Sequence, residues 1–364
     1  MKIHTLVVDD SALIRKVLSD ILNEDPEITV IATAVNGRAA IEKVEKLKPD
    51  VVILDNIMPV LDGLNTLGYI MSECPTPVIM ISALEEKAAE ITLTAFEYGA
   101  VDVIQKPGGI ISQSMAEIGE DICKKVKIAA KVNLKNLEFM GKYIKKEGVG
   151  ENLTSTNENG LDSINIASPP LIKNIIAIGA STGGPRALEK LISAFPADLP
   201  AAVLLVQHMP ANFTASFAER LNTRSALNVK EAKEGDLVES GTVLIAPGDF
   251  HMEIKRKKVN GIIREFVHLN KKEKENGARP SVNVLFRSIA PIYGSKIISM
   301  ILTGMQCDGA DGAEEIKKWG GKVIAEARSS CVVYGMPKEV VKRNLADSVL
   351  PLDKIAAEVM SMLK

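Results

Sequence analysis

The chain has 364 residues, longer than one ordinary domain and enough for two of typical size. Its 44 lysines and arginines nearly balance its 46 aspartates and glutamates, and no dense basic stripe is apparent, which argues against nucleic acid as a partner. The N-terminus turns acidic too soon for a signal peptide, no apolar run spans a membrane and the four cysteines form no CxxC pair, so we expect a cytoplasmic protein with reduced thiols and no membrane insertion.

The first part of the chain alternates short β-branched runs with amphipathic helical segments. Helices are predicted between successive strands, followed by a long fifth helix from about Ser112 that extends to about residue 145. The predicted strands lie near residues 6–9, 29–34, 51–55, 77–83 and 101–105. Because such alternation builds a parallel sheet covered by helices on both faces, we predict an α/β domain over residues 1–133.

Polar residues stand at the predicted carboxyl ends of these strands, where parallel sheets bind ligands. They are Asp9, Asp10, Asp55, Ser82 and Lys106. Three converging carboxylates repel one another unless a cation lies among them, and an oxygen-only ligand set favours Mg²⁺. Ser82 and Lys106 would then meet the oxygens of a transferred phosphoryl group. One such aspartate is usually a helix cap or turn residue, but five residues together favour a ligand site.

The same residues resemble the response-regulator receiver domain. Its pattern is an acidic pair, a phosphoacceptor Asp followed by xxMPxxDG, a Ser or Thr, and Lys-Pro. Here the phosphoacceptor segment reads LDNIMPVLDG around Asp55, and Lys106 is followed by Pro107. The resemblance implies a flavodoxin-like, doubly wound, five-stranded parallel sheet in which a chemotaxis histidine kinase supplies the phosphoryl group to Asp55.

The receiver resemblance also implies roles for the residues around Asp55. Ser82 and Lys106 would sense the phosphoryl group. The Mg²⁺ ligands would be Asp9, Asp10, Asp55 and the main-chain carbonyl of Ile57. One departure from the pattern is Val103, which stands where receivers usually carry an aromatic switch residue.

A composition change separates this domain from the rest of the chain. Residues 146–170 are rich in Gly, Asn, Ser and charge without hydrophobic periodicity, which predicts a flexible linker. Residues 171–364 then resume the α/β alternation, with an antiparallel hairpin predicted near residues 251–269. The other strands are predicted near 175–180, 202–207, 242–247, 297–303 and 322–327. We expect a second doubly wound α/β domain that includes this hairpin.

A candidate nucleophile follows the first strand of the second domain. IIAIGASTGGPRAL places Ser181 before a helix N-terminus, whose N–H groups can stabilise an oxyanion, although an ordinary N-cap or a phosphate-binding turn explains this fragment equally well. His208 and Asp308 follow two further apolar strands. Convergence of Ser, His and Asp at three strand ends favours a catalytic triad. His251 is the rival base, but it begins the predicted hairpin instead of ending a parallel strand.

Several segments resemble the catalytic domain of the chemotaxis protein-glutamate methylesterase/protein-glutamine glutaminase family, which joins a receiver to this domain in this order. They are GASTGGP, QHMP, LIAPGDFHM, RPSVNVLF and VVYGMPKE. The resemblance implies that Ser181 is the nucleophile, His208 the general base and Asp308 the residue that orients it. Thr182 and the main chain at Met305 would contribute to the oxyanion site.

The family resemblance implies a concrete function. It is phosphorylation-activated hydrolysis of glutamate γ-methyl esters on methyl-accepting chemoreceptors for chemotactic adaptation, with deamidation of glutamines as a companion activity. No cofactor is implied for the esterase step. The alternative is a phosphorylation-dependent binding module with weakened catalysis, because four positions depart from the family pattern. These are Ala278, Asn283, Gln306 and Ala327.

Overall fold

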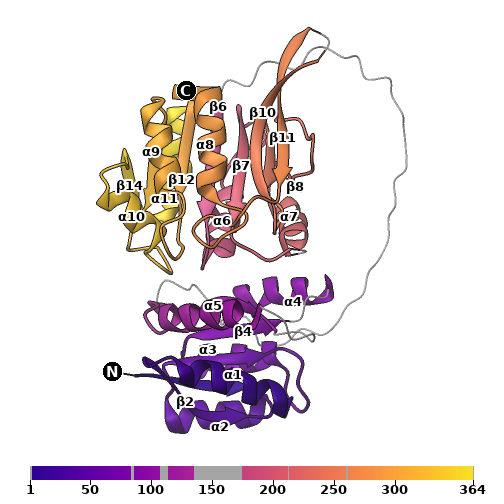
Figure 1. The fold of residues 1–364 in the computed structure, drawn as a ribbon, viewed down its shortest axis with the longest axis vertical. Helices are drawn as coiled ribbons and strands as arrows, with labels where there is room; N and C mark the ends of the chain where they lie inside the picture. The colour runs from indigo at the N-terminus through magenta and orange to yellow at the C-terminus, as the bar shows by residue number, and fades with distance from the viewer. Residues whose placement is uncertain are drawn as a thin grey trace, which may run out of the picture.

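The computed structural model describes residues 2–82, 86–106, 114–134, 174–211, 213–259 and 261–363. They form two α/β units, called here the N-terminal and C-terminal domains, which lie one against the other (Figure 1). The predicted linker, residues 146–170, lies outside the described residues.

The N-terminal domain has a five-stranded parallel sheet in the order β2-β1-β3-β4-β5, which confirms the predicted doubly wound fold. The strands are β1 (Ile3–Val8), β2 (Ile28–Ala34), β3 (Val51–Asp55), β4 (Val78–Ser82) and β5 (Asp102–Gln105). The helices are α1 (Ala12–Glu24), α2 (Gly37–Leu47), α3 (Gly63–Glu73), α4 (Glu86–Glu97) and α5 (Ser114–Ala129). The fifth helix ends at Ala129, short of the predicted extension, of which residues 135–145 lie outside the described part of the chain.

Local sequence explains why these elements begin where they do. All five residues of β3 are buried, as expected for a central parallel strand covered on both faces. Ser11, Asn36 and Asp62 are the N-caps of α1, α2 and α3, and each accepts a hydrogen bond from the first turn of its helix. These caps fix the strand-to-helix turns at the edge of the sheet where the polar residues gather.

The C-terminal domain has a seven-stranded parallel sheet in the order β14-β13-β12-β6-β7-β9-β8. Its strands are β6 (Asn174–Ala180), β7 (Ala201–Gln207), β8 (Asn228–Glu231), β9 (Thr242–Ile245), β12 (Ile297–Ile301), β13 (Lys322–Glu326) and β14 (Ser348–Leu350). Its α-helices are α6 (Gly184–Ile192), α7 (Phe213–Arg224), α8 (Val282–Tyr293), α9 (Ala310–Lys318), α10 (Met336–Lys342) and α11 (Leu352–Met362). The predicted hairpin is confirmed as the antiparallel pair β10 (His251–Val259) and β11 (Ile262–Asn270).

The sequence prediction missed the two edge strands, β8 and β14. They have four and three residues and are only partly buried, so neither carries a long apolar run. The central strands β6 and β7 are buried along nearly their whole length and were therefore recognisable as apolar runs.

The two domains contact each other through helices. In the N-terminal domain, α4 packs against α6 and α7 of the C-terminal domain. Phe96 of α4 and Phe213 of α7 belong to one continuous cluster of buried apolar residues. Within the described residues, none of the helices has the length and apolar character needed to span a bilayer.

Candidate functional site

A cluster of acidic residues lies at the carboxyl ends of β1 and β3. Asp9 follows β1 and Asp55 ends β3, and both are buried, whereas Asp10 is exposed. One oxygen of each side chain lies within 4.8 Å of the other two. Lys106, directly after β5, places Nζ 2.8 Å from Asp55 Oδ2 and 3.2 Å from Asp9 Oδ2. The structure thus brings together the three acids and the lysine.

The electrostatics of this cluster suit a cation. Burial, together with repulsion from Asp9, raises the pKa of Asp55 although Lys106 opposes the shift. Burial favours the neutral form of Lys106, but the two carboxylates outweigh it and raise the pKa of Lys106. A divalent cation would relieve the repulsion, and carboxylate oxygens are ligands that Mg²⁺ prefers. The residues present therefore fit Mg²⁺.

The loop after Asp55 is shaped by α3. Asp62 accepts a hydrogen bond from Asn65 N at 2.8 Å, and Gly63 N donates to Asn56 O at 2.8 Å. A Cβ at Gly63 would collide with the main chain of Asp55, so this close approach of α3 requires glycine.

Two further residues of the predicted phosphoacceptor site can be placed only in part. Ile57 lies two residues beyond Asp55 in the loop after β3, and its side chain is exposed. Ser82 ends β4, the neighbour of β3, but its side chain lies outside the described residues. Their expected roles stay predictions.

Ser181 lies in a tight turn between β6 and α6. Its N–H donates to Thr303 O at 3.0 Å, and its carbonyl accepts from Gly184 N at 2.7 Å. Gly183 has a φ of 78°, in the left-handed region that favours glycine, and a Cβ there would collide with Val332. The glycines thus permit the turn that holds Ser181 at a helix N-terminus.

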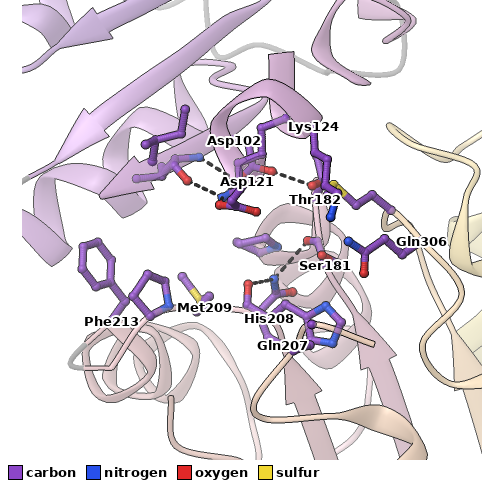
Figure 2. A pocket seen from close by; sticks show the side chains of 18 of the residues that line it. Asp102, Asp121, Lys124, Ser181, Thr182, Gln207, His208, Met209, Phe213 and Gln306 are labelled. Carbon is purple, nitrogen blue, oxygen red and sulfur yellow. Dashed lines mark hydrogen bonds and ion pairs between the residues drawn. The ribbon is translucent and has the colours of Figure 1, made fainter. Parts of the chain in front are cut away.

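The side chains of His208 and Asp308 form a direct pair. His208 follows β7, the neighbour of β6, and its Nε2 lies 2.8 Å from Asp308 Oδ2. Nδ1 is the ring nitrogen left for Ser181, which lies in the same cleft (Figure 2). Among the described residues no hydrogen bond joins Ser181 to His208, and in substrate-free enzymes such bonds often tighten only when substrate binds.

Asp308 is fully buried and surrounded by hydrogen-bond donors from the start of α8. It accepts from Ser281 Oγ at 2.8 Å, Val282 N at 2.7 Å and Asn283 N at 3.1 Å. Burial opposes ionisation, but the hydrogen bonds from His208 and from the α8 N-terminus outweigh it and lower the pKa of Asp308. A carboxylate that stays charged can orient His208 and stabilise its protonated form.

Two buried polar side chains that the sequence prediction missed hold the loops of the triad. Gln207 Nε2 donates to the carbonyls of Ser181 at 3.0 Å and His208 at 3.1 Å. Glu326 Oε2 accepts from the N–H of Thr303 at 2.8 Å, and the Thr303 carbonyl accepts from Ser181. The only sequence feature that pointed to Gln207 was its position next to His208. No sequence feature linked Glu326 to the triad, because it lies on a different strand, β13.

His251, the rival base, lies elsewhere. It begins β10, is buried, and its Nε2 lies 2.9 Å from the carbonyl oxygen of Glu273. It lines a different cavity, beside Glu253 and Arg287. His208 is therefore the histidine that the fold places with the triad residues.

Ser181 and His208 line a cavity of about 660 Å³ to which both domains contribute. Asp121 and Lys124 of α5 face the cavity from the N-terminal domain (Figure 2). Thr182 Oγ1 donates a hydrogen bond of 2.5 Å across the interface to Asp102 Oδ2. Lys125 Nζ lies 3.2 Å from the other carboxylate oxygen, Asp102 Oδ1. The N-terminal domain thus forms one wall of the cleft in which Ser181 lies.

An ion-pair cluster reinforces this contact. Glu97 of α4 pairs with Arg220 and Arg224 of α7, with Arg224 Nη1 2.6 Å from Glu97 Oε1. Burial opposes ionisation of Glu97, but the two arginines outweigh it and lower its pKa. The domain contact therefore combines apolar packing with partly buried charge pairs.

The expected oxyanion residues, Thr182 and Met305, both line the cavity. The Thr182 hydroxyl is occupied by Asp102. Within the described parts of the chain, the main-chain N–H groups of Thr182 and Met305 donate no hydrogen bond, so both are available to a developing oxyanion.

The four departures from the family pattern differ in their distance from the cleft. Gln306 and Ala278 line the cavity, and Gln306 has a φ of 68°, where glycine is favoured. Asn283 does not line the cavity, and its main-chain N–H donates to Asp308 Oδ1 at 3.1 Å. The main-chain N–H of Ala327 donates to Leu350 O at 2.7 Å, and Ala327 does not line the cavity.

Comparisons with known proteins identify both domains. Residues 176–359 match the CheB methylesterase family, and residues 5–112 match the response regulator receiver domain. A protein-glutamate methylesterase/protein-glutamine glutaminase 2 of Methanosarcina acetivorans is 67% identical over 363 residues, with 100% of both chains covered. A protein-glutamate methylesterase/protein-glutamine glutaminase of Pyrococcus horikoshii is 44% identical, covering 100% of this chain and 94% of the other.

A solved structure resembles the C-terminal domain. The crystal structure of the Thermotoga maritima CheB methylesterase catalytic domain matches with 47% sequence identity and a TM-score of 0.51. The match covers 53% of this chain and 100% of that one.

Proposed function

Because the chain belongs to the CheB methylesterase family and carries a receiver domain, we propose that it hydrolyses glutamate γ-methyl esters of chemoreceptors under the control of phosphorylation at Asp55. The observation that carries the proposal is the pair of His208 and the buried Asp308, 2.8 Å apart, with His208 in the cleft that contains Ser181. The names of the relatives support both ester hydrolysis and deamidation of glutamine.

The geometry supports acyl transfer through a Ser-His-Asp triad. Ser181 Oγ attacks the ester carbonyl while Nδ1 of His208 takes its proton, and Asp308 stabilises the charged ring. The oxyanion accepts hydrogen bonds from the main-chain N–H groups of Thr182 and Met305. His208 then returns the proton to the leaving methoxy oxygen, and water hydrolyses the acyl-enzyme. At a glutamine carboxamide the same steps release ammonia.

The contact between the domains supports control by the receiver. Asp102, which accepts a hydrogen bond from Thr182, begins β5, and Lys106 directly follows the end of that strand. Phosphorylation of Asp55 adds charge that draws Lys106, and a shift of β5 weakens the bond from Asp102 to the nucleophile loop. The unphosphorylated receiver thus restricts substrate access.

The receiver site needs only positioning and charge neutralisation. Asp9, Asp10 and Asp55 would hold Mg²⁺, which would neutralise charge on these carboxylates and on the incoming phosphoryl group. Lys106 and Ser82 contact the phosphoryl oxygens. A chemotaxis histidine kinase is the proposed phosphodonor.

A serine-directed fluorophosphonate probe tests the proposal against the alternative of a binding module. We expect the probe to label the full-length protein on Ser181, with faster labelling after treatment with a phosphodonor. Ser181→Ala should abolish labelling. Absence of labelling in the phosphorylated wild-type protein, with correct folding shown by circular dichroism, would favour the binding module.

Asn283 gives a prediction about pH. Its Oδ1 accepts from Gly309 N at 2.9 Å and Gly312 N at 2.8 Å, and both bonds survive in Asn283→Asp. The new carboxylate lies beside Asp308 and disfavours its charged form. Because its pKa is lowered in the folded protein, Asp308 stabilises the fold above the pKa that it has in the unfolded chain, and this stabilisation is lost as the pH falls. We expect the midpoint of acid unfolding of Asn283→Asp, followed by circular dichroism, to move to higher pH by about one unit. An acid-unfolding midpoint at the wild-type pH would contradict this coupling.

A further inference from the structure

The distal half of the β10–β11 hairpin carries a charged surface that the esterase mechanism does not use. Figure 1 shows the hairpin projecting beyond the C-terminal domain at the end away from the N-terminal domain. Between residues 255 and 264 the chain has five cationic side chains and no carboxylate. They are Lys255, Arg256, Lys257, Lys258 and Arg264. The expectation of no dense basic stripe is therefore wrong at this one place.

The strand register concentrates these cations. Lys257 lies directly opposite Arg264, and like charges facing each other across an antiparallel pair destabilise it. Lys255 and Arg256 have carboxylate partners in Glu253 and Glu265. Within the described ranges, Lys257, Lys258 and Arg264 form no ion pair, although Lys257 Nζ lies 5.9 Å from the centroid of the Phe266 ring and its charge helps to lower the pKa of Glu234. Lys257 and Arg264 share one face of the hairpin, and Lys258, the next residue of β10, lies on the other face. The distal hairpin thus has cations without ion-pair partners on both faces, which an anionic surface would stabilise.

The last positions of the hairpin ladder carry exposed aliphatic side chains. Val259 pairs with Ile262 at the last position of the ladder, and Ile263 follows. These side chains are 42%, 43% and 54% exposed. Val259 and Ile262 therefore lie beyond the cations, and Ile263 is level with Lys258, its partner across the ladder. The three aliphatic side chains flank Asn260 and Gly261 in the sequence, so the exposed aliphatic surface belongs to the part of the ladder next to the turn.

We propose that this hairpin tip docks on an anionic lipid surface. Val259, Ile262 and Ile263 enter the boundary between headgroups and acyl chains, and the cations contact lipid phosphates. A bilayer fits better than an acidic protein because a specific protein interface needs about 800 Å² from each partner, whereas the hairpin end is only two strands wide. This end of the hairpin points away from the N-terminal domain, which forms one wall of the triad cleft (Figure 1), so docking leaves that cleft uncovered.

The test uses the full-length protein and vesicles without receptors, so it is independent of the esterase activity. Co-sedimentation at low salt should show binding to vesicles containing phosphatidylglycerol and little binding to pure phosphatidylcholine. The triple variant Lys257→Glu, Lys258→Glu, Arg264→Glu should bind at least about tenfold more weakly. Ile262→Ser with Ile263→Ser should also weaken binding, without changing the net charge.

A matched control separates the tip from net charge. Lys46, Lys338 and Lys342 are exposed lysines outside the hairpin, and changing all three to Glu gives the same change in charge. This control should bind vesicles within about threefold of wild type. Failure of the wild-type protein to bind anionic vesicles, or equal loss in the control, would overturn the proposal. Binding to soluble polyglutamate but not to vesicles would also overturn it and assign the tip to an acidic protein.

Discussion

Replacing His208 with glutamine should lower the turnover of a glutamyl methyl ester by about four orders of magnitude. Glutamine cannot take the proton of Ser181, and it breaks the 2.8 Å pair with Asp308. The effect should appear mainly in kcat, because a proton transfer is lost while the cleft stays intact. Methanol release from a methylated receptor fragment at saturating substrate measures it.

His251→Gln is the matched control. His251 is buried in β10 and contacts the carbonyl of Glu273, away from the triad cleft. We expect turnover within about tenfold of wild type, together with a lower melting temperature because a buried polar contact is altered. If His251→Gln were the more damaging substitution for turnover, the assignment of the base would be wrong.

Asp55→Asn should abolish labelling of the protein by acetyl phosphate in the presence of Mg²⁺. The amide removes the nucleophilic oxygen and a negative charge from a cluster whose oxygens lie within 4.8 Å of one another. Stimulation of the esterase by phosphodonor should disappear in the same variant. Phosphate incorporation and methanol release are measured on the same samples.

Asp62→Asn is the control for this loop. Asp62 caps α3 seven residues beyond Asp55, and asparagine caps a helix about as well as aspartate. Labelling should therefore remain within about threefold of wild type. Labelling of Asp55→Asn at the wild-type rate would place the phosphoacceptor at another residue.

The central strands and the strand-end residues could be predicted from sequence because burial on both faces leaves long apolar runs. The runs ending at Asp55, before Ser181 and before His208 are of this kind. Edge strands such as β8 and β14 lack that signal, since they are short and partly exposed. Helix ends were the least accurate feature, as α5 shows.

The residues that support the triad could not be predicted in the same way. Asn283 and Glu326 act through hydrogen bonds to main-chain groups more than twenty residues away in sequence, and only the folded chain brings these groups together. The contact between Asp102 and Thr182 joins two domains and leaves no local pattern. The charged hairpin tip depends on the strand register, which places Lys257 opposite Arg264.

Methanol release from methylated chemoreceptor membranes by full-length protein, with and without phosphodonor, tests the central claim most directly. We expect phosphodonor to raise the rate by about tenfold, because phosphorylation of Asp55 weakens the contact that restricts the cleft. Glu97→Gln, which weakens the ion pairs with Arg220 and Arg224, should raise the unstimulated rate and reduce the response. No methanol release from wild-type protein in either state would contradict the account.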